Sequence, residues 1–416
     1  MKNNVGIIGA GVSGLSAGQL LKDNGNNVSI FESKNIPGGL ISCTRENNIL
    51  FHRVGGHVFN TKIPEVANWF WSKVNKDEFS LTKRVAKIFI ENKILGYPIE
   101  NYIYLLDEKN IINIISELLI ILQSENNKVE AENFDDFLKI NFGDTLYNLY
   151  FRPYNEKIWK TDLSKIPLNW LEGKLPMPNI KDIILSNIIK KEERNMVHSS
   201  FWYPKNNGSQ FIADSLAEGL DILYNTNVVN IERTENTWII NNKSFDKIIY
   251  TGDVRKLADI LSDDVLPINL KNKLKKLKSN GTTNVLCEID SNNYSWMYFP
   301  EEKYKIHRII STGNFAESNN GDSERRTCTI EYSGYLSREE MEYEIKQLPG
   351  NPNIIAYNFE PNSYIYHTTE TANIIDSIKN YMEKQSFYLV GRFAEWQYYN
   401  MDKAIEASMK LVRKYL

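Results

Sequence analysis

The chain has 416 residues, and its 49 Lys and Arg against 52 Asp and Glu give a formal net charge of −3. Its 42% hydrophobic and 24% charged residues are typical of a soluble globular protein with two or three domains. This balance excludes a broad cationic surface for nucleic acid or membrane lipid, so an anionic ligand has to meet local cations.

The three cysteines, Cys43, Cys287 and Cys328, lie far apart and form neither a CxxC pair nor a metal-ligand spacing. We therefore expect reduced thiols, no metal site and a cytoplasmic location. Residues 111–122 form the most apolar stretch, which is too short and too polar to span a bilayer. The first strand is expected from residue 5, so we expect no signal peptide.

The first strand and helix carry a glycine pattern. An apolar run at 5–8 predicts a buried parallel strand, and Gly9-x-Gly11-x-x-Gly14 predicts a tight turn into a helix. Here Gly9 permits the turn, Gly11 lets a pyrophosphate approach the backbone, and Gly14 lets the helix pack closely on the strand. The helix N-terminus adds N–H groups and a positive dipole end for the phosphates.

A second strand is predicted at 27–32, and it ends on an acid, Glu32. A carboxylate roughly 20 residues after the glycines can accept hydrogen bonds from ribose hydroxyls, which makes the glycine turn a predicted dinucleotide site. Gly38-Gly39 follows at once and is typical of flavoproteins, so it favours FAD over NAD. An ordinary glycine loop is the alternative.

Helix and strand signals alternate after these elements. Gly55-Gly56-His57 is a turn with a histidine at its exit, a helix is expected over 63–74, and a hairpin over 85–99. Residues 101–195 are mostly helical by their apolar period, with breaks at prolines.

Strand signals return after residue 200. Strands are predicted at 221–224, 228–233, 237–240 and 247–251, and the last is expected to rejoin the first sheet together with 387–391. An antiparallel sheet is predicted from 284–290, 295–299, 305–311 and 327–332, and a final helix from 401–415.

These elements predict an α/β fold: a discontinuous Rossmann-like FAD-binding domain with an inserted helical domain and an antiparallel-sheet domain. The expected limits are 1–75, 200–255 and 384–416 for the FAD-binding domain, 100–195 for the helical substrate-covering domain, and 76–99 and 256–383 for the sheet domain.

Several blocks spread over the chain share a family pattern. They are Gly55-Gly56-His57-Val58, Tyr97-Pro98-Ile99, a Tyr-x-x-Lys-x-Trp stretch within 151–159, and the segments 169–174, 248–251, 307–310 and 329–332. The most specific block is the closing Gly391-Arg392-Phe393 with its downstream tyrosines. With these blocks the sequence resembles the FAD-dependent UDP-galactopyranose mutases and their pyranose–furanose mutase relatives.

The resemblance implies an isomerase that interconverts the pyranose and furanose forms of a nucleotide sugar (UDP-galactose-like). Reduced flavin would attack the anomeric carbon through N5 with no net redox change, and the furanose (galactofuranose) would serve cell-surface polysaccharide biosynthesis. The implied partners are FAD in its reduced form, a reductant such as NAD(P)H, and the nucleotide sugar. A homodimer is compatible with the resemblance.

The resemblance also implies residue roles. The catalytic set comprises His57 by the flavin ring, Arg308 on the substrate pyrophosphate, and Tyr366 and Tyr398 on the phosphates. The substrate-binding set comprises Tyr97, Tyr154, Asn155, Trp159, Lys174, Arg308, Tyr366, Tyr398 and Asn400. The cofactor-binding set comprises Gly9, Gly11, Val12, Ser13, Gly14, Glu32, Ser33, Gly38, Gly39, Leu40, Gly56, His57, Val228, Gly391, Arg392, Tyr399, Asn400 and Met401.

Three positions depart from the family pattern. Lys174 stands where a second arginine usually grips the pyrophosphate, and a lysine keeps the charge but loses the bidentate fork. Asn400 replaces an aspartate, and Asn60 replaces a second histidine. These changes leave the sugar and the base open.

Two other functional classes stay open. An FAD-dependent amine oxidase or protoporphyrinogen-oxidase-like oxidoreductase would share the first forty residues and would need no pyrophosphate clamp. A non-catalytic nucleotide-binding protein would share the same dinucleotide site, but it would not need the family segments that the resemblance assigns to a substrate cleft.

Overall fold

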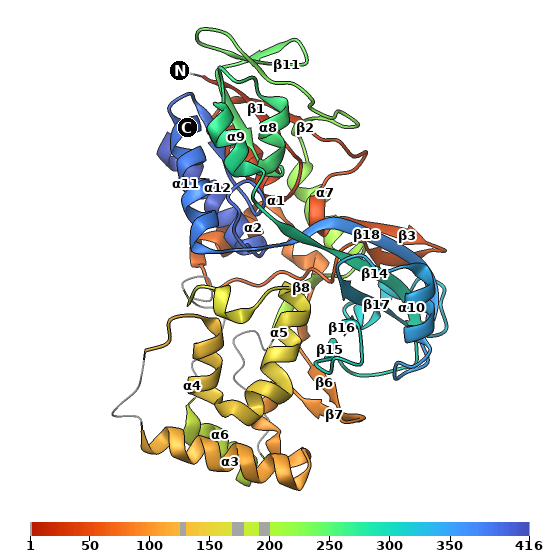
Figure 1. Cartoon of the computed structure of the whole chain (residues 1–416). Helices are drawn as coiled ribbons and strands as arrows, with labels where there is room; N and C mark the ends of the chain where they lie inside the picture. The colour runs from red at the N-terminus through yellow and green to blue at the C-terminus, as the bar shows by residue number, and fades with distance from the viewer. Residues whose placement is uncertain (1, 125–129, 169–178, 191–199, 416) are drawn as a thin grey trace.

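Figure 1 shows the computed structural model of the chain, which describes residues 2–124, 130–168, 179–190 and 200–415. A parallel sheet with its helices lies at the top of the view, a helical layer at the bottom and an antiparallel sheet at the right. The predicted α/β class is confirmed, whereas the limits of the three domains stay predictions.

The parallel sheet has the strand order β19-β13-β1-β2-β9, and all of its neighbouring pairs are parallel. Its strands are β1 (Asn4–Ile8), β2 (Asn27–Phe31), β9 (Asp221–Leu223), β13 (Lys247–Tyr250) and β19 (Phe387–Leu389). The predicted return of 247–251 and 387–391 to the first sheet is thus confirmed.

Helices cover both faces of this sheet, because its strands are apolar on both sides. Val5 and Ile7 of β1 belong to one buried cluster, and Ile8 belongs to a second. The first face carries α1 (Val12–Asp23), α2 (Pro64–Lys73), α7 (Gly208–Ala217) and α12 (Met401–Tyr415). The second face carries α8 (Leu257–Ile260), α9 (Ile268–Leu274) and α11 (Thr369–Glu383).

The second sheet has the order β18-β14-β17-β16-β15-β6-β7, and only the β15–β6 pair in it is parallel. Its strands are β6 (Ala86–Ile90), β7 (Lys93–Gly96), β14 (Ser279–Ile289), β15 (Trp296–Tyr298), β16 (Ile306–Ile310), β17 (Arg326–Ser333) and β18 (Asn353–Ile365). The hairpin and the four predicted strands are present.

Two strand expectations differ from the structure. The 13-residue β18 was not expected, because Asn358 and Pro361 interrupt its alternation. The strand expected at 228–233 shrinks to β10 (Glu232–Arg233), since only these two residues pair with β11 (Trp238–Ile240).

The helical layer consists of α3 (Glu108–Gln123), α4 (Phe134–Leu146), α5 (Arg152–Trp159) and α6 (Ile180–Ile188). A π-helical turn, Tyr147–Phe151, joins α4 directly to α5. Leu118 and Leu138 of this layer share a buried cluster with Ile88 and Tyr298 of the antiparallel sheet. The layer therefore packs on one face of that sheet, with α5 nearest to it in Figure 1.

Shorter elements connect these parts: β3 (Cys43–Glu46), β4 (Ile49–His52), β5 (Phe79–Lys83), β8 (Ser200–Pro204), β12 (Lys243–Phe245) and α10 (Arg338–Ile345). Among the helices of the described residues, none has both the length and the apolar character that a bilayer span requires.

Candidate active site

The glycine turn between β1 and α1 has the geometry that the sequence predicts. Gly9 has a φ of +102° and donates its N–H to the Phe31 carbonyl at 2.8 Å. A Cβ on Gly14 would collide with the Gly9 carbonyl oxygen, so only glycine lets α1 start this close to β1.

Glu32 closes this turn at the end of β2. One of its carboxylate oxygens accepts the Ala10 N–H at 2.7 Å, and the other accepts the Lys34 N–H at 2.9 Å. The Ser33 hydroxyl lies 3.3 Å from the second oxygen. The carboxylate is thus buried beside the glycine turn, where its remaining lone pairs can accept hydroxyl groups of a bound ribose.

Two further segments meet the start of α1. Gly38 donates its N–H to the Ala10 carbonyl at 2.8 Å, and both Gly38 and Gly39 have positive φ. Gly391, with a φ of +104°, packs so closely that an added Cβ would lie 2.5 Å from the Ser13 hydroxyl oxygen. Turns from residues 9–14, 38–39 and 391 therefore converge on one helix N-terminus.

Gly11 shows that this turn fits a dinucleotide. Its φ of −77° is ordinary, and an added Cβ would have only the Gly39 Cα nearby, at 4.0 Å. Glycine at this position is thus required neither by the backbone conformation nor by a packing neighbour. It leaves the backbone N–H groups at the start of α1 accessible, as binding of a pyrophosphate requires.

The other members of the predicted cofactor set lie in the segments that surround this turn. Val12 is buried at the start of α1, Leu40 lies in the 3₁₀ turn Gly39–Ile41, Val228 follows β9, Tyr399 and the exposed Asn400 precede α12, and Met401 begins that helix. No described contact tests their roles, so they stay predictions.

A row of polar side chains crosses the face of the antiparallel sheet that the helical layer covers. In register, Tyr298 of β15 pairs with Arg308 of β16, Arg308 pairs with Glu331 of β17, and Glu331 pairs with Asn284 of β14. Directly paired residues lie on the same face of a sheet. The four side chains therefore form one line across it.

Glu331 organises the centre of this row. The Arg308 Nη2 donates to both carboxylate oxygens at 2.8 and 2.9 Å, and the Tyr364 hydroxyl donates to one of them at 3.0 Å. His307 lies 2.8 Å from the same carboxylate through Nε2. A β-bulge between Ile306 and Arg308 allows two consecutive side chains to reach Glu331.

The charge states of this group follow from burial and pairing. Burial alone would raise the pKa of the Glu331 carboxyl, but the Arg308 charge and the His307 and Arg308 hydrogen bonds outweigh burial and hold it well below its usual range. Burial lowers the pKa of His307, so this ring is neutral near pH 7 and donates through Nε2. The row therefore holds an ion pair between the ionised Glu331 carboxylate and the permanently charged Arg308 guanidinium.

The Gly55-Gly56-His57 turn packs directly on this row. The Gly55 N–H donates to the Asn284 side-chain oxygen at 3.0 Å, and a Cβ on Gly56 would lie 2.6 Å from Ile310. Burial, and next the charge of Arg392, lower the pKa of His57 to about 4. Its buried Nε2 has no hydrogen-bond partner among the described residues, as expected for an atom that faces a bound group.

Helix α5 forms the opposite wall. The Tyr154 ring lies edge-on to Tyr298 at 5.6 Å, and the Trp159 ring lies edge-on to Tyr364 at 5.5 Å. Asn155 accepts the Trp159 indole N–H at 3.3 Å, which fixes the ring. Tyr97 flanks the same wall, with its ring 5.2 Å from Tyr298.

The chain end completes the cleft. The Tyr398 ring stacks on Tyr364 at 5.8 Å and meets Trp159 edge-on at 5.6 Å. The Arg392 guanidinium lies 4.0 Å from the Tyr398 ring centroid and donates to the Ser363 carbonyl at 2.6 Å. Arg392 therefore links the glycine turn of the cofactor site to the aromatic walls of the cleft.

The tyrosine found in the Arg308 network differs from the predicted one. Tyr364, two residues before the predicted Tyr366, is the tyrosine in the Arg308 and Glu331 network. Tyr366 follows the end of β18, and its carbonyl accepts the Trp396 indole N–H at 3.0 Å. Lys174 lies outside the described residues.

The structure adds three residues that sequence reasoning left without a role. Glu331 lies in the family segment 329–332, and the only hint of its role in the sequence is that it is a single acid in an apolar strand. Arg84 donates to the Tyr298 hydroxyl at 3.1 Å and lies 5.6 Å from the Tyr97 ring centroid. Only the fold brings Arg84 and Tyr298 to the cleft, because they are far apart in the sequence.

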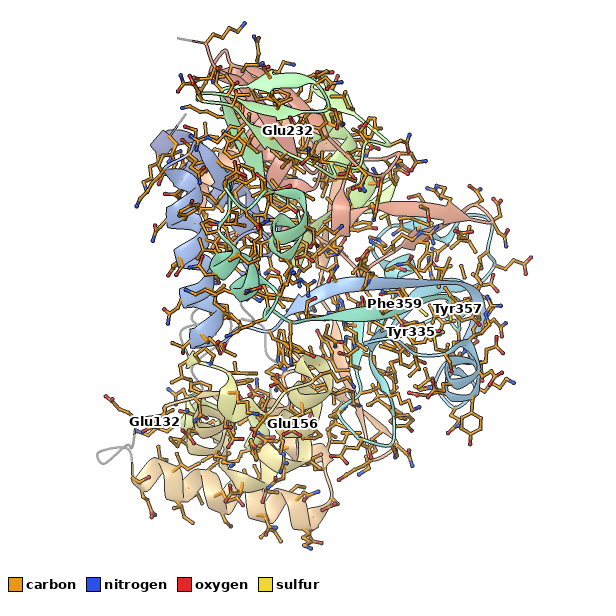
Figure 2. The ribbon with its side chains drawn as sticks, turned by 45° about the horizontal axis from the view of Figure 1, so that its top comes forward. Glu132, Glu156, Glu232, Tyr335, Tyr357 and Phe359 are labelled. Carbon is orange, nitrogen blue, oxygen red and sulfur yellow. The ribbon has the colours of Figure 1, made fainter. Side chains whose placement is uncertain are left out.

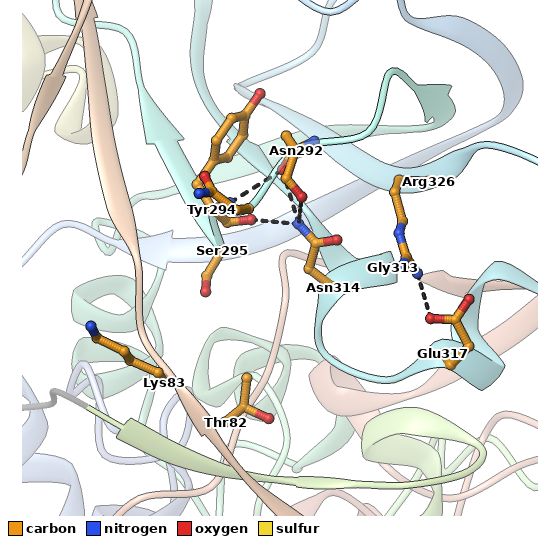
Figure 3. A pocket seen from close by; sticks show the side chains of 10 residues that line it. Thr82, Lys83, Asn292, Tyr294, Ser295, Gly313, Asn314, Glu317 and Arg326 are labelled. Atoms are coloured by element: carbon orange, nitrogen blue, oxygen red, sulfur yellow. Dashed lines mark hydrogen bonds and ion pairs between the residues drawn. The ribbon is translucent and has the colours of Figure 1, made fainter.

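Figure 3 shows a further polar pocket, of about 290 Å³. Its lining includes Lys83, Asn292, Asn314 and an ion pair between Arg326 and Glu317. None of the predicted site residues lines it. Within the described ranges, no three His, Cys, Asp or Glu side chains group as ligands of a metal ion.

Comparisons with known proteins agree with this geometry. Residues 7–73 match a family described as an NAD(P)-binding Rossmann-like domain. The chain is 23% identical to the UDP-galactopyranose mutase of Mycoplasma genitalium over 427 residues, with 99% of this chain and 94% of that one covered. A crystal structure of reduced UDP-galactopyranose mutase matches with a TM-score of 0.88 at 19% identity, covering 99% of this chain and 93% of that one.

A redox enzyme is also similar. The coproporphyrinogen III oxidase of Staphylococcus aureus is 26% identical over 62% of this chain and 59% of its own length. The mutase match spans nearly the whole of both chains, so the family resemblance drawn from the sequence is confirmed.

Proposed function

We propose that this chain, a relative of the UDP-galactopyranose mutases, is a flavin-dependent isomerase that interconverts the pyranose and furanose forms of a nucleotide sugar of the UDP-galactose type. The observation that carries the proposal is the Arg308–Glu331 pair, which sets a fixed cation between two aromatic walls beside the Gly-Gly-His turn. A diphosphate leaving group needs such a cation.

The cofactor of the proposed enzyme is FAD. Its adenine dinucleotide part would be held by the start of α1, Glu32 and the turns at Gly38-Gly39 and Gly391. Bound in reduced form, flavin supplies a nucleophile for the anomeric carbon, so the isomerisation has no net redox change. We assign the reduction to a donor of the NAD(P)H type.

The protein's own residues have three tasks in this reaction. Arg308 would stabilise the diphosphate as it leaves the sugar and retain it for return, with a hydroxyl donor from Tyr398, while the Tyr364 hydroxyl holds Glu331 in place. Tyr154 and Trp159 would cover the substrate and exclude water, which would otherwise hydrolyse the activated sugar. Lys174 would add a second cation.

His57 has a positioning task in this account. With a pKa of about 4 it is neutral at physiological pH, so it adds no charge beside the flavin ring. Its backbone is fixed by the Gly55 hydrogen bond to Asn284, and its buried Nε2 offers a single polar contact to the cofactor.

A cytoplasmic location fits the cysteines. Cys287 of β14 and Cys328 of β17 lie directly opposite each other in register and are both free thiols. Such a pair can persist as thiols in a reducing compartment, so we place the proposed enzyme in the cytoplasm. The formation of a homodimer stays a prediction.

The second candidate is an oxidase of the same flavoprotein superfamily, and the similarity to coproporphyrinogen III oxidase favours it. An oxygen electrode and the flavin absorbance spectrum separate the two. With a panel of nucleotide sugars under air, the mutase proposal predicts neither flavin reduction by the sugar nor oxygen uptake coupled to its conversion. Bleaching of the flavin by an amine or a porphyrinogen, followed by oxygen uptake, would assign the chain to the oxidases instead.

A further inference from the structure

Lys157 lies in helix α5 between the two cleft residues Tyr154 and Trp159, and its side chain points away from solvent toward the antiparallel sheet. The ammonium nitrogen donates to three backbone carbonyls, those of Phe299 at 2.7 Å, Glu301 at 2.8 Å and Ile306 at 3.2 Å. An ammonium group has three N–H donors, so this set satisfies all of them.

The carbonyls of Phe299 and Glu301 belong to the turn that joins β15 to β16, and that of Ile306 belongs to the first residue of β16. Phe299 directly follows Tyr298, and Ile306 lies two residues before Arg308. One ammonium group therefore connects the helix that carries one wall of the cleft to the hairpin that carries the other wall. The same helix is also held by Ser333, whose hydroxyl donates to the Ile158 carbonyl at 2.8 Å.

We propose that Lys157 is a positioning residue that sets the distance between the two walls of the substrate cleft, by holding Tyr154 and Trp159 against Tyr298 and Arg308. This inference rests on the proposed function, because it concerns the nucleotide-sugar cleft. Lys157 touches neither substrate nor cofactor in this account. It acts through the helix that it holds in place.

The charge state of Lys157 makes this role depend on pH. Burial lowers its pKa to about 7, opposed by the carboxylates of Glu344 on α10 and of Glu301 and Glu302 in the turn. Lys160, directly after α5, and His307 on β16 also face it. Above pH 7 the neutral amine keeps two N–H donors and turns a lone pair to one carbonyl, which weakens the connection between helix and hairpin.

The test compares wild type with Lys157→Met, which removes all three donors, and with Lys157→Gln, which keeps two. The control is a change to Glu156 on the same helix, labelled in Figure 2. Glu156→Gln breaks an exposed ion pair with Arg152 whose atoms lie 3.1 Å apart. Dissociation constants for UDP are measured by titration calorimetry on the FAD-loaded enzymes, together with kcat, KM and melting temperature.

We expect the dissociation constant for UDP and the KM to rise at least tenfold in Lys157→Met and by less in Lys157→Gln, while kcat falls less than threefold. Glu156→Gln should match wild type. The advantage of wild type over Lys157→Met in UDP affinity should shrink from pH 6 to pH 9, since the wild-type amine loses its proton in this range.

A lower melting temperature with unchanged UDP affinity and an unchanged pH profile in both Lys157 variants would overturn the inference and leave the proposed function standing. If Lys157→Met does not fold, UDP affinity and its pH profile are compared between wild type and Lys157→Gln, and the same outcomes decide. Wild-type enzyme that does not bind UDP at all would overturn both the inference and the proposed function.

Discussion

At the scale of single residues, Arg308 carries most of the proposed chemistry. Replacing it with alanine removes the cation that meets the diphosphate, and it leaves the Glu331 carboxylate buried without its main partner. We expect kcat/KM to fall by about 100-fold or more, the range that single charge-stabilising donors contribute in enzymes. Bound FAD, measured by its absorbance, should stay at the wild-type ratio, because Arg308 lies outside the glycine turns. Turnover at the wild-type rate would remove Arg308 from the site.

Glu331 makes a prediction about stability. Its pKa is depressed below the ordinary 4.5 of a glutamate in the folded protein, so its contribution to stability is present above about pH 4.5 and is lost as the pH falls below it. Glu331→Gln should lower the free energy of unfolding at pH 7 by about 3 kcal/mol, since breaking a buried charge pair costs of that order. Denaturant melts at pH 7 and pH 4 measure both effects.

The difference in unfolding free energy between wild type and Glu331→Gln should shrink as the pH is lowered from 7 to 4. The exposed pair of Arg152 and Glu156 gives a matched control, because such surface pairs contribute about 0.5 kcal/mol or less. A constant difference across this pH range would show that the carboxylate does not supply the stability.

A block of neighbouring residues singled out Arg308 in the sequence, and its role stays a prediction. The sequence could not predict that Arg308 and His307 both reach Glu331, since strict alternation sends consecutive strand residues to opposite faces. A bulge changes this, and no residue in the strand signals it. That Tyr364 joins this network, two positions before the predicted Tyr366, could not be predicted for a similar reason: the two tyrosines look alike until the register of β18 with β14 is known.

At the scale of elements, the glycine turn gives a test that separates cofactor binding from folding. Gly11→Ala has an allowed backbone conformation and no close neighbour, so the protein should fold with wild-type stability. The new methyl group would occupy the space in which the pyrophosphate approaches the backbone. We expect a loss of FAD binding of at least tenfold, measured as flavin per protein after purification and by titration of the apoprotein.

The control for this test is Gly14→Ala, where the Cβ would collide with the Gly9 carbonyl oxygen and impair folding itself. Gly11→Ala protein that binds FAD as tightly as wild type would contradict the assignment of this turn to the pyrophosphate.

Helices and strands whose apolar residues recur at a regular spacing were predicted from the sequence, whereas elements with an interrupted spacing were not. The glycine turn, helix α1 and the hairpin of β6 and β7 follow from local patterns that each segment carries alone. Strand β18 does not, because Pro361 and polar residues interrupt its alternation, and it is held by its long pairing with β14. The Lys157 contacts also depend on the packing of two distant segments, so spacing alone could not reveal them.

At the scale of the whole molecule, the site is assembled from five distant parts of the chain. The glycine turn comes from the start, the histidine turn from residues 55–57, one wall from α5, the other from β15 to β17, and Arg392 and Tyr398 from the end. The glycine pattern and the family blocks in the sequence pointed to each of these five segments. Their mutual geometry required the fold, and the role of Lys174 stays a prediction.

The most direct test of the account is to follow UDP-galactopyranose with enzyme that is reduced by dithionite without oxygen, and in parallel with the oxidised enzyme. The account predicts a furanose product, identified by NMR, with reduced wild-type enzyme only, and none with reduced Arg308→Ala. Equal product formation by the oxidised enzyme would contradict the requirement for reduced flavin. Absence of a furanose product from this and every other nucleotide sugar offered to the reduced enzyme would contradict the mutase function itself.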